Sequence, residues 1–83
     1  MLKISHQNFG TVNKNAVTVE DDRGSTTVYF SYDTPVAFTT DGEDIVCSEN
    51  IWSRTTGKFL NELQPDKNKR IPNAKFLELL SNL

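Results

Sequence analysis

Hydrophobic and polar positions alternate in the middle of the chain, and this alternation indicates strands of an antiparallel sheet. The pattern starts at Ala16, is interrupted by the turn-forming residues 21–24 and resumes over residues 26–32. Side chains of a strand point alternately to its two faces, so one face of the second strand should carry Val28, Phe30 and Tyr32. This region is therefore predicted to be a β-hairpin.

A second hairpin is expected after the break at Pro35, which has no N–H to donate to a ladder. Residues 36–40 are expected to form another short strand. The pair Asp41-Gly42 follows it and is a strong hairpin signal, leading into a further strand over residues 43–48.

Residues 16–48 thus predict a four-stranded antiparallel meander, whereas residues 1–15 lack a clear apolar pattern and are expected to be an arm or an edge strand. An open sheet of this size with one apolar face is unstable alone. It needs a cover, which the C-terminal half should supply, over Val28, Phe30, Val36, Phe38 and Ile45.

The first helix is predicted over residues 53–63. Ser53 is a favourable N-cap residue, and Pro65 cannot continue a helix. Gly57 costs about 1 kcal/mol relative to Ala inside a helix, so it either weakens the prediction or marks the close approach of another group. One side of this helix carries, at helical spacing, Trp52, Thr56, Phe59, Leu60 and Leu63.

A second helix is predicted over residues 73–83, with Asn73 as its cap. Its large apolar side chains exceed what a small sheet must bury: Phe76, Leu77, Leu79, Leu80 and Leu83. This surplus favours a homo-oligomer that forms through the C-terminal helix. The whole pattern predicts an α+β fold in one domain of 83 residues, a four-stranded antiparallel β-meander packed by two short C-terminal helices.

Composition favours a reducing compartment. The single cysteine, Cys47, fits the cytoplasm better than secretion and is expected to pack as a small buried hydrophobe. No stretch approaches the roughly 18 apolar residues that a membrane span requires, and residues 1–15 are too polar for a signal sequence. The expected location is the cytoplasm, with no membrane partner.

Charge is segregated along the chain, although the formal net charge is only -2. Residues 16–49 hold eight carboxylates and a single cation, Arg23, whereas residues 54–75 hold six cations and two carboxylates. The acidic part suits a solvated surface or a mimic of DNA. The basic run Lys67, Lys69 and Arg70 suits a solvated linker or a contact to a nucleic-acid backbone.

No catalytic or metal-binding constellation is apparent. Acid–base or nucleophilic chemistry usually requires a His or Cys with a polar partner, and His6 and Cys47 both lack a recognisable signature. Residues 41–44 lack the alternating ligands of a calcium loop, and residues 55–58 lack the glycine spacing of a phosphate loop. We expect a non-enzyme without catalytic residues, metal or cofactor.

Residues 50–63 are the best candidate for a ligand- or partner-binding site. Free amides at a helix N-terminus favour anions, and side chains around this predicted helix start could add donors around a phosphate or carboxylate. The simpler interpretation is that these side chains only cap the helix, pack on the sheet or form a solvated face. The residues are Trp52, Ser53, Arg54, Thr55, Thr56 and Lys58, with secondary contacts from Lys67, Lys69 and Arg70.

Two stretches of the chain carry a resemblance to known domains. They are S-Y-D-T-P-V-A-F at residues 31–38 and E-N-I-W-S-R-T-T-G-K-F-L-N at residues 49–61. Together they resemble a family of small uncharacterised domains of phages and prokaryotic mobile elements. The position of Phe59 is often His in that family, so chemistry that rests on this His cannot be carried over. The resemblance implies an intracellular chain that binds and blocks a host component.

These features favour a phage-type binding protein in the host cytoplasm. It would act in counter-defence, by inhibiting a host immune protein or by sequestering an anionic ligand. One alternative is a nucleic-acid-binding accessory protein that uses Arg54, Lys58 and the basic run. Nucleic acid is less favoured than a protein or a small ligand, because an acidic segment accompanies the basic one. Another alternative is a structural virion or assembly subunit.

Overall fold

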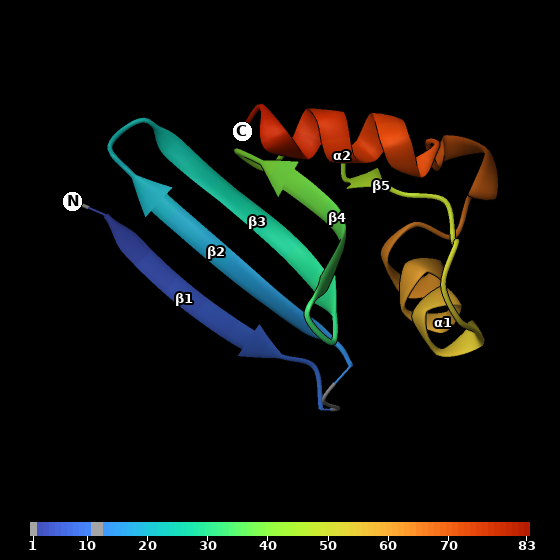
Figure 1. Ribbon diagram of the computed structural model, residues 1–83. Coiled ribbons are helices and arrows are strands. Elements are labelled where there is room, and N and C mark those ends of the chain that lie inside the picture. The colour runs from blue at the N-terminus through green and yellow to red at the C-terminus, as the bar shows by residue number, and fades with distance from the viewer. Residues whose placement is uncertain (1, 11–12) are drawn as a thin grey trace.

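The computed structural model describes residues 2–10 and 13–83 and shows a five-stranded sheet with two helices beside it (Figure 1). The strands are β1 (Lys3–Asn8), β2 (Asn15–Asp21), β3 (Gly24–Ser31), β4 (Thr34–Thr40) and β5 (Val46–Cys47). The helical segments are α1 (Arg54–Leu63), the short 3-10 turn η1 (Lys67–Lys69) and α2 (Asn73–Ser81). The predicted α+β class with two C-terminal helices is confirmed.

The strands form an antiparallel meander in chain order, with β1 at one edge and β5 at the other. The predicted number of four strands is wrong, because part of the segment predicted to be an arm or an edge strand forms the edge strand β1. This strand pairs along its whole length with β2, from Lys3 opposite Glu20 to Asn8 opposite Asn15. All six of its residues are exposed, so the backbone ladder rather than buried side chains holds it. A strand without an apolar face leaves no periodic signal in the sequence.

Side-chain hydrogen bonds shape the turns at one end of the sheet. In the β2–β3 turn, the Asp21 carboxylate accepts from the backbone N–H groups of Arg23 and Gly24, at 2.8 and 3.1 Å. The Asp41 carboxylate accepts from the N–H of Ser25 at 2.9 Å. A Cβ atom at Gly24, whose φ is +151°, would collide with the Asp41 carboxylate. The β2–β3 turn and the end of β4 therefore meet closely at this position.

The turn between β3 and β4 differs from the prediction. Tyr32 has a φ of 57° and is 58% exposed, so it lies in the turn and does not share a strand face with Val28 and Phe30. Pro35 already belongs to β4 and does not break the sheet. The predicted strand over residues 43–48 is also too long, because β5 comprises only Val46–Cys47.

A β-bulge in β4 places two consecutive side chains in one core. Tyr29 lies opposite Ala37 and Phe30 lies opposite Pro35, so Val36 is the extra residue on β4. Val36 and Ala37 are both fully buried. They belong to one cluster, together with Cys47, Phe59 and Leu60.

The two helices cover opposite faces of β4. Ala37 packs in the cluster that contains Phe59 and Leu60 of α1. The next residue, Phe38, contacts Phe76 of α2, with 5.7 Å between the ring centroids. Because consecutive strand residues point to opposite faces, α1 and α2 lie on different sides of the sheet. The C-terminal half supplies the cover as predicted, but on both sides of β4 rather than over one apolar face.

The helices begin in different ways. Ser53 caps α1 as predicted, since its side chain accepts a hydrogen bond from the N–H of Thr56 at 3.3 Å. Asn73 does not cap α2, because it is the first helical residue and its own N–H donates to the Glu49 carboxylate at 3.0 Å. The Asn73 amide also donates to the Ser48 hydroxyl at 3.1 Å. Residues distant in sequence thus position the start of α2.

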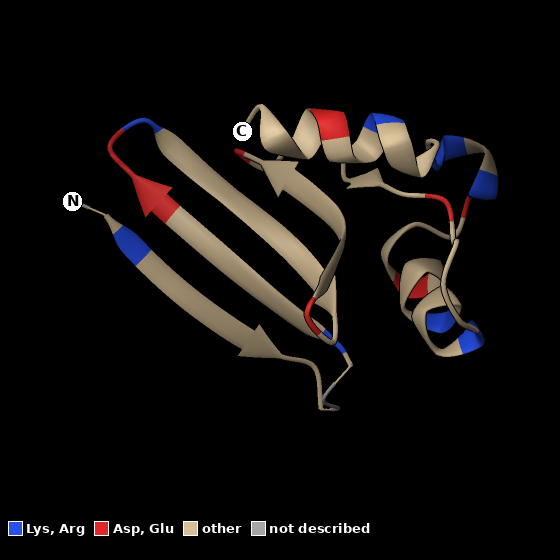
Figure 2. Ribbon diagram, viewed as in Figure 1, with Lys and Arg blue, Asp and Glu red and all other residues tan. Residues whose placement is uncertain are grey.

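The segregation of charge in the sequence becomes a separation in space (Figure 2). Carboxylates gather at the β2–β3 turn and at the β4–β5 connection beside it. Cations gather at the helical end of the molecule, on α1 and around η1. The carboxylates of the two turns and of the strand end before them are Glu20, Asp21, Asp22, Asp41, Glu43 and Asp44.

Candidate functional site

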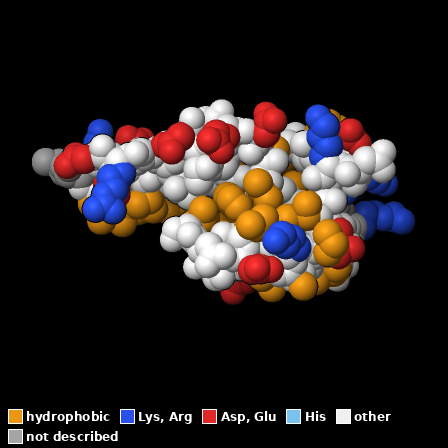
Figure 3. All heavy atoms as spheres, turned by 90° about the horizontal axis from the view of Figure 1, so that it is seen from above, with side chains coloured by type: hydrophobic (Ala, Val, Ile, Leu, Met, Phe, Trp, Pro, Cys, Tyr) orange, Lys and Arg blue, Asp and Glu red, His pale blue; other side chains and the backbone are white. Residues whose placement is uncertain are grey.

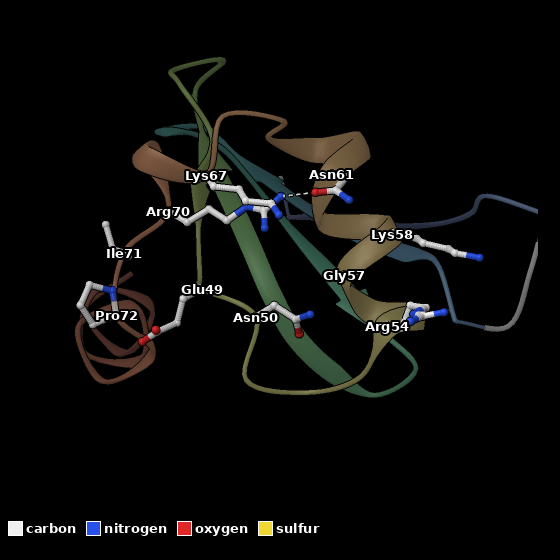
Figure 4. A pocket seen from close by; sticks show the side chains of 10 residues that line it. All are labelled: Glu49, Asn50, Arg54, Gly57, Lys58, Asn61, Lys67, Arg70, Ile71 and Pro72. Carbon is white, nitrogen blue, oxygen red and sulfur yellow. Dashed lines mark hydrogen bonds between the residues drawn. The ribbon is translucent and has the colours of Figure 1, made fainter.

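A pocket of about 570 Å³ opens between α1 and the segment that links η1 to α2 (Figure 4). Two amide side chains, from Asn50 and Asn61, lie in its lining, and Ile71 and Pro72 provide an apolar part. The lining also carries four cations, two from the first turns of α1 and two from η1 and the residue after it: Arg54, Lys58, Lys67 and Arg70.

The amphipathic pattern of α1 sets which side chains reach the pocket. Thr56, Phe59 and Leu60 are buried, and this stripe docks the helix on the sheet. Side chains at i, i+4 and i+7 share one side of a helix. The side of α1 that lines the pocket carries, at this spacing, Arg54, Lys58 and Asn61.

Asn50 is held against α1 at a position that has no side chain. Its Nδ2 donates to the Ser53 carbonyl at 3.1 Å, and its Oδ1 accepts from the N–H of Trp52 at 3.0 Å. A Cβ atom at Gly57 would stand 2.7 Å from Asn50 Nδ2, closer than side chains normally approach. Gly57 therefore marks the close approach of another group, one of the two interpretations that the sequence left open.

The guanidinium of Arg70 is fixed by the protein itself. Its Nε and Nη2 donate to the Gln64 carbonyl at 3.3 and 3.0 Å, and Nη2 also donates to Asn61 Oδ1 at 2.7 Å. These bonds tie the group to the end of α1 and leave Nη1 for a ligand. Arg70 is thus a preorganised donor at the pocket wall.

The balance of charge in the pocket favours an anion. Glu49 is the one carboxylate among the lining residues, and its Oε2 already accepts from the N–H of Asn73. In the described part of the chain, the ion pairs do not involve pocket cations, since they join Lys14 to Glu62 and Lys75 to Glu78.

Arg54 and Lys58 are the two pocket cations on α1. Both are exposed, and neither side chain makes a hydrogen bond or an ion pair with the described residues. In Figure 4 their charged ends extend away from Arg70. Closing them around a ligand requires only side-chain rotation, because their backbone positions are set by α1.

The structure places the sequence-predicted site residues in two groups. The cations of the primary and the secondary site line one pocket, except for Lys69, which lies on η1 outside the lining. Thr55 is exposed outside the lining, and Trp52 is partly buried against the core cluster. Ser53 caps α1, and the hydroxyl of buried Thr56 lies 2.7 Å from Ser31 Oγ.

Three polar lining residues were not predicted. Asn61 follows Arg54 and Lys58 at helical spacing, so the sequence did carry a signal for it. Asn50 accepts a hydrogen bond from the N–H of Trp52, two residues on, and Asn side chains commonly form turns of this kind. Glu49 carried no signal, because only the packing of α2 brings it to the pocket.

His6 and Cys47 lie on opposite edge strands of the sheet, in β1 and β5. His6 is exposed, with its Nε2 3.1 Å from Asn15 Oδ1. Cys47 is buried, as predicted. Burial raises the pKa of the Cys47 thiol to about 11, although the positive charge of Arg70 works in the lowering direction. The thiol is therefore neutral and part of the core at physiological pH.

Two further observations concern metal ligands and membrane-spanning helices. Within residues 2–10 and 13–83, no three His, Cys, Asp or Glu side chains gather as metal ligands. The helices of the described chain are too short or too polar to cross a membrane. The pocket itself presents positive charge and hydrogen-bond donors.

Fold and pocket together define a class: small α+β proteins in which an antiparallel meander presents a cationic pocket beside its first helix. Residues 3–78 match the model of a family of unknown function, DUF8033. The chain belongs to this family. No curated protein and no solved structure matches the chain. Membership of a family of unknown function is confirmed at this level. The association with phages and prokaryotic mobile elements, and the sequence pattern that carried the resemblance, stay predictions.

Proposed function

We propose that the protein is a non-enzymatic binding protein that holds a phosphate-bearing ligand in the cationic pocket. The observation that carries this proposal is that two separate segments bring their cations to one opening, namely Arg54, Lys58, Lys67 and Arg70. Gathered like charges repel one another, and an anion between them relieves this repulsion. A bound phosphate would therefore stabilise the pocket as well as fill it.

The size and the donors of the pocket support a ligand larger than a single phosphate ion. Small-molecule sites typically measure roughly 300–1,000 Å³, and this pocket measures about 570 Å³. Arg70 supplies a fixed planar donor, while Arg54 and Lys58 supply mobile charge. Asn50 and Asn61 can hydrogen-bond a neutral part of the ligand. A nucleotide-sized phosphate ester fits this arrangement.

Sequestration of such a ligand is the form of host-component blocking that the pocket supports. It requires no catalytic residue, only a preorganised cationic site. The phage setting and the counter-defence role rest on the sequence resemblance and stay predictions. A surface that inhibits a host immune protein directly remains the other form of the same hypothesis.

A second candidate function is contact with a nucleic-acid backbone. The observation that favours it is that Lys69 extends the positive surface along η1 beyond the pocket lining. Backbone contacts are independent of base sequence and weaken steeply with salt. A pocket ligand would instead be held by a few defined contacts inside the opening.

Calorimetric titration with a nucleoside diphosphate and with inorganic pyrophosphate tests the proposal. The double variant Arg54→Ala/Lys58→Ala should bind on the order of 10- to 100-fold more weakly than the wild type, because two charged contacts are lost. Its thermal stability should stay unchanged, since both side chains are exposed. Lys75→Ala is the matched control, because Lys75 is an exposed cation of α2 outside the pocket.

Three outcomes would contradict this proposal. Absence of binding to both compounds at low salt would overturn it. Equal binding by the wild type and the double variant would place the ligand outside the pocket. Tight, salt-sensitive binding of oligonucleotides of any sequence, without binding of nucleoside diphosphates, would favour the second candidate.

A further inference from the structure

The two edges of the sheet differ in how far other segments of the chain cover them. At the β5 edge, the N–H of Ile71 donates to the Cys47 carbonyl at 3.0 Å, and the N–H of Glu49 donates to the Ile71 carbonyl at 2.8 Å. Ser48 and Ile71 also form a parallel bridge. This edge is therefore covered by the segment before α2. At the other edge, no strand within residues 2–10 and 13–83 pairs with the outer side of β1.

The β1 strand lacks the features that usually prevent edge-to-edge pairing. Proteins protect free edges with proline, several charges, bulges or very short strands. β1 is six residues long, its pairing with β2 is regular, and Lys3 is its single charged residue. All six residues are exposed. The outer side of β1 is thus a regular row of backbone donors and acceptors that another strand can use.

An exposed apolar strip accompanies this edge. Ile4 lies opposite Val19 of β2, so the two side chains share one face of the sheet. Ile4 is 66% exposed, Val19 is 38% exposed, and the neighbouring Leu2 is 62% exposed. Figure 3 shows hydrophobic side chains in the middle of the view from above and again at its left end, where Figure 1 places the N-terminus.

We propose that β1 pairs antiparallel with β1 of a second copy of this chain, about a twofold axis perpendicular to the sheet. Such an axis keeps equivalent faces of the two sheets on the same side. In a register centred on Ser5, Lys3 of one copy lies opposite Gln7 of the other, and Ile4 lies opposite His6. The two lysines are then at opposite ends of the pair, and the apolar strip of each copy continues on the same face of the joined sheet.

A second copy fits this edge better than an unrelated strand, because twofold pairing is self-complementary and meets no like charge. The interface is independent of the cationic pocket, since no pocket residue lies in β1 or β2. Pairing of two six-residue strands buries less accessible surface than a stable interface does, which is about 1,200 Å² or more. The dimer is therefore weak and concentration-dependent, with a dissociation constant on the order of micromolar to hundreds of micromolar.

Sedimentation velocity over a concentration series, from low micromolar to millimolar protein, tests this pairing. The wild type should shift from monomer to dimer as its concentration rises. Ile4→Lys, which places a second charge on the edge, should weaken the dimer at least about tenfold. Leu77→Lys is the matched control: Leu77 is 48% exposed on α2, the helix that the sequence predicted as the interface. This variant should dimerise as the wild type does.

Hydrogen exchange of the β1 amides measures the pairing directly. Alternate amides of β1 should become more protected as protein concentration rises, while the α2 amides stay unchanged. A wild type that remains monomeric at millimolar concentration overturns the proposal. A dimer that survives Ile4→Lys but is lost in Leu77→Lys also overturns it. Thermal unfolding of both variants verifies that they are folded, which exposed positions should permit.

Discussion

The helical end of the molecule and the β1 edge of its sheet are stabilised in different ways. Next to α1, five side chains of β4, β5 and α1 form a fully buried cluster. At the other edge, all six residues of β1 are exposed, and the strand relies on its ladder with β2, which is joined to β3 in turn. A strand of this kind is stable only because its neighbours are anchored elsewhere. Stability is thus concentrated at one end and transmitted through backbone pairing to the other.

The acidic and the cationic regions also differ in how far the fold uses their charges. Asp21 and Asp41 accept hydrogen bonds from backbone N–H groups and so shape the turns that carry them. The side chains of Arg54, Lys58 and Lys67 make no hydrogen bond or ion pair with the described residues. The acidic region is therefore explained in part by folding. The side chains of Arg54, Lys58 and Lys67 have no such role, whereas Arg70 is held by the end of α1. We therefore assign binding to the pocket that these cations line.

The largest expected effect sharpens the contrast between the packed and the open region. Leu60→Ala should destabilise the protein by about 2–5 kcal/mol, because Leu60 is fully buried in the core cluster and its truncation leaves a cavity. Ile4→Ala in β1 should change the free energy of unfolding by less than about 0.5 kcal/mol. Chemical denaturation of both variants measures the difference. Equal losses would show that β1 is packed and not open.

A pH-dependent loss of stability should come from Cys47. Its pKa rises from the ordinary 9.0 to about 11 on folding, so the folded state favours the neutral thiol. This contribution is fully present below pH 9 and is lost as the pH rises to about 11, with a total on the order of 2 kcal/mol. Denaturation curves between pH 8 and 11 measure it. Cys47→Ala, although less stable, should lose this part of the pH dependence, and an unchanged profile would contradict the assignment.

Loss of a buried hydrogen bond should destabilise the contact between α1 and the end of β3. The hydroxyls of Ser31 and Thr56 are 2.7 Å apart and buried. Thr56→Val keeps the shape but leaves the Ser31 hydroxyl without this partner, at a cost of roughly 1–2 kcal/mol. The double variant Ser31→Ala/Thr56→Val should recover part of this loss in thermal denaturation. A larger loss in the double variant would mean that packing, not the hydrogen bond, dominates.

The smallest expected effect concerns the cap of α1. Ser53→Ala should cost about 1 kcal/mol, because the Thr56 N–H loses its acceptor. Ser53→Asp, which retains an acceptor, should restore most of the stability. If neither substitution changes the melting temperature, the first turn of α1 contributes little to the helical end.

Much of the fold could be predicted from particular residues. Ser53 and Pro65 bracket a helix, and the stripe through Phe59 and Leu60 indicates the side that α1 buries. The alternation after Ala16 predicts β2 and β3. The exact ends of the strands could not be predicted in the same way, as Tyr32 shows. Its side chain continues the alternation, but its backbone has the positive φ of the turn.

The candidate site could be predicted only in pieces. In the sequence, Arg54 and Lys58 lie beside the predicted helix start, and Lys67 and Arg70 belong to a separate basic run. That these cations line one pocket depends on the path between α1 and α2, where Arg70 bonds to the end of α1. No local pattern encodes such a contact, and the placing of Glu49 at the start of α2 is equally non-local.

The sequence by itself determined the helices, the central strands and the side of α1 that carries charge, because periodicity and capping act over a few neighbouring residues. Only the tertiary structure decided that β1 joins the sheet, that α1 and α2 lie on opposite faces of β4, and that two cationic segments share one pocket. Those features arise from pairing between distant segments. Their free energy depends on what the folded chain buries and hydrogen-bonds together, and no short stretch of residues records it.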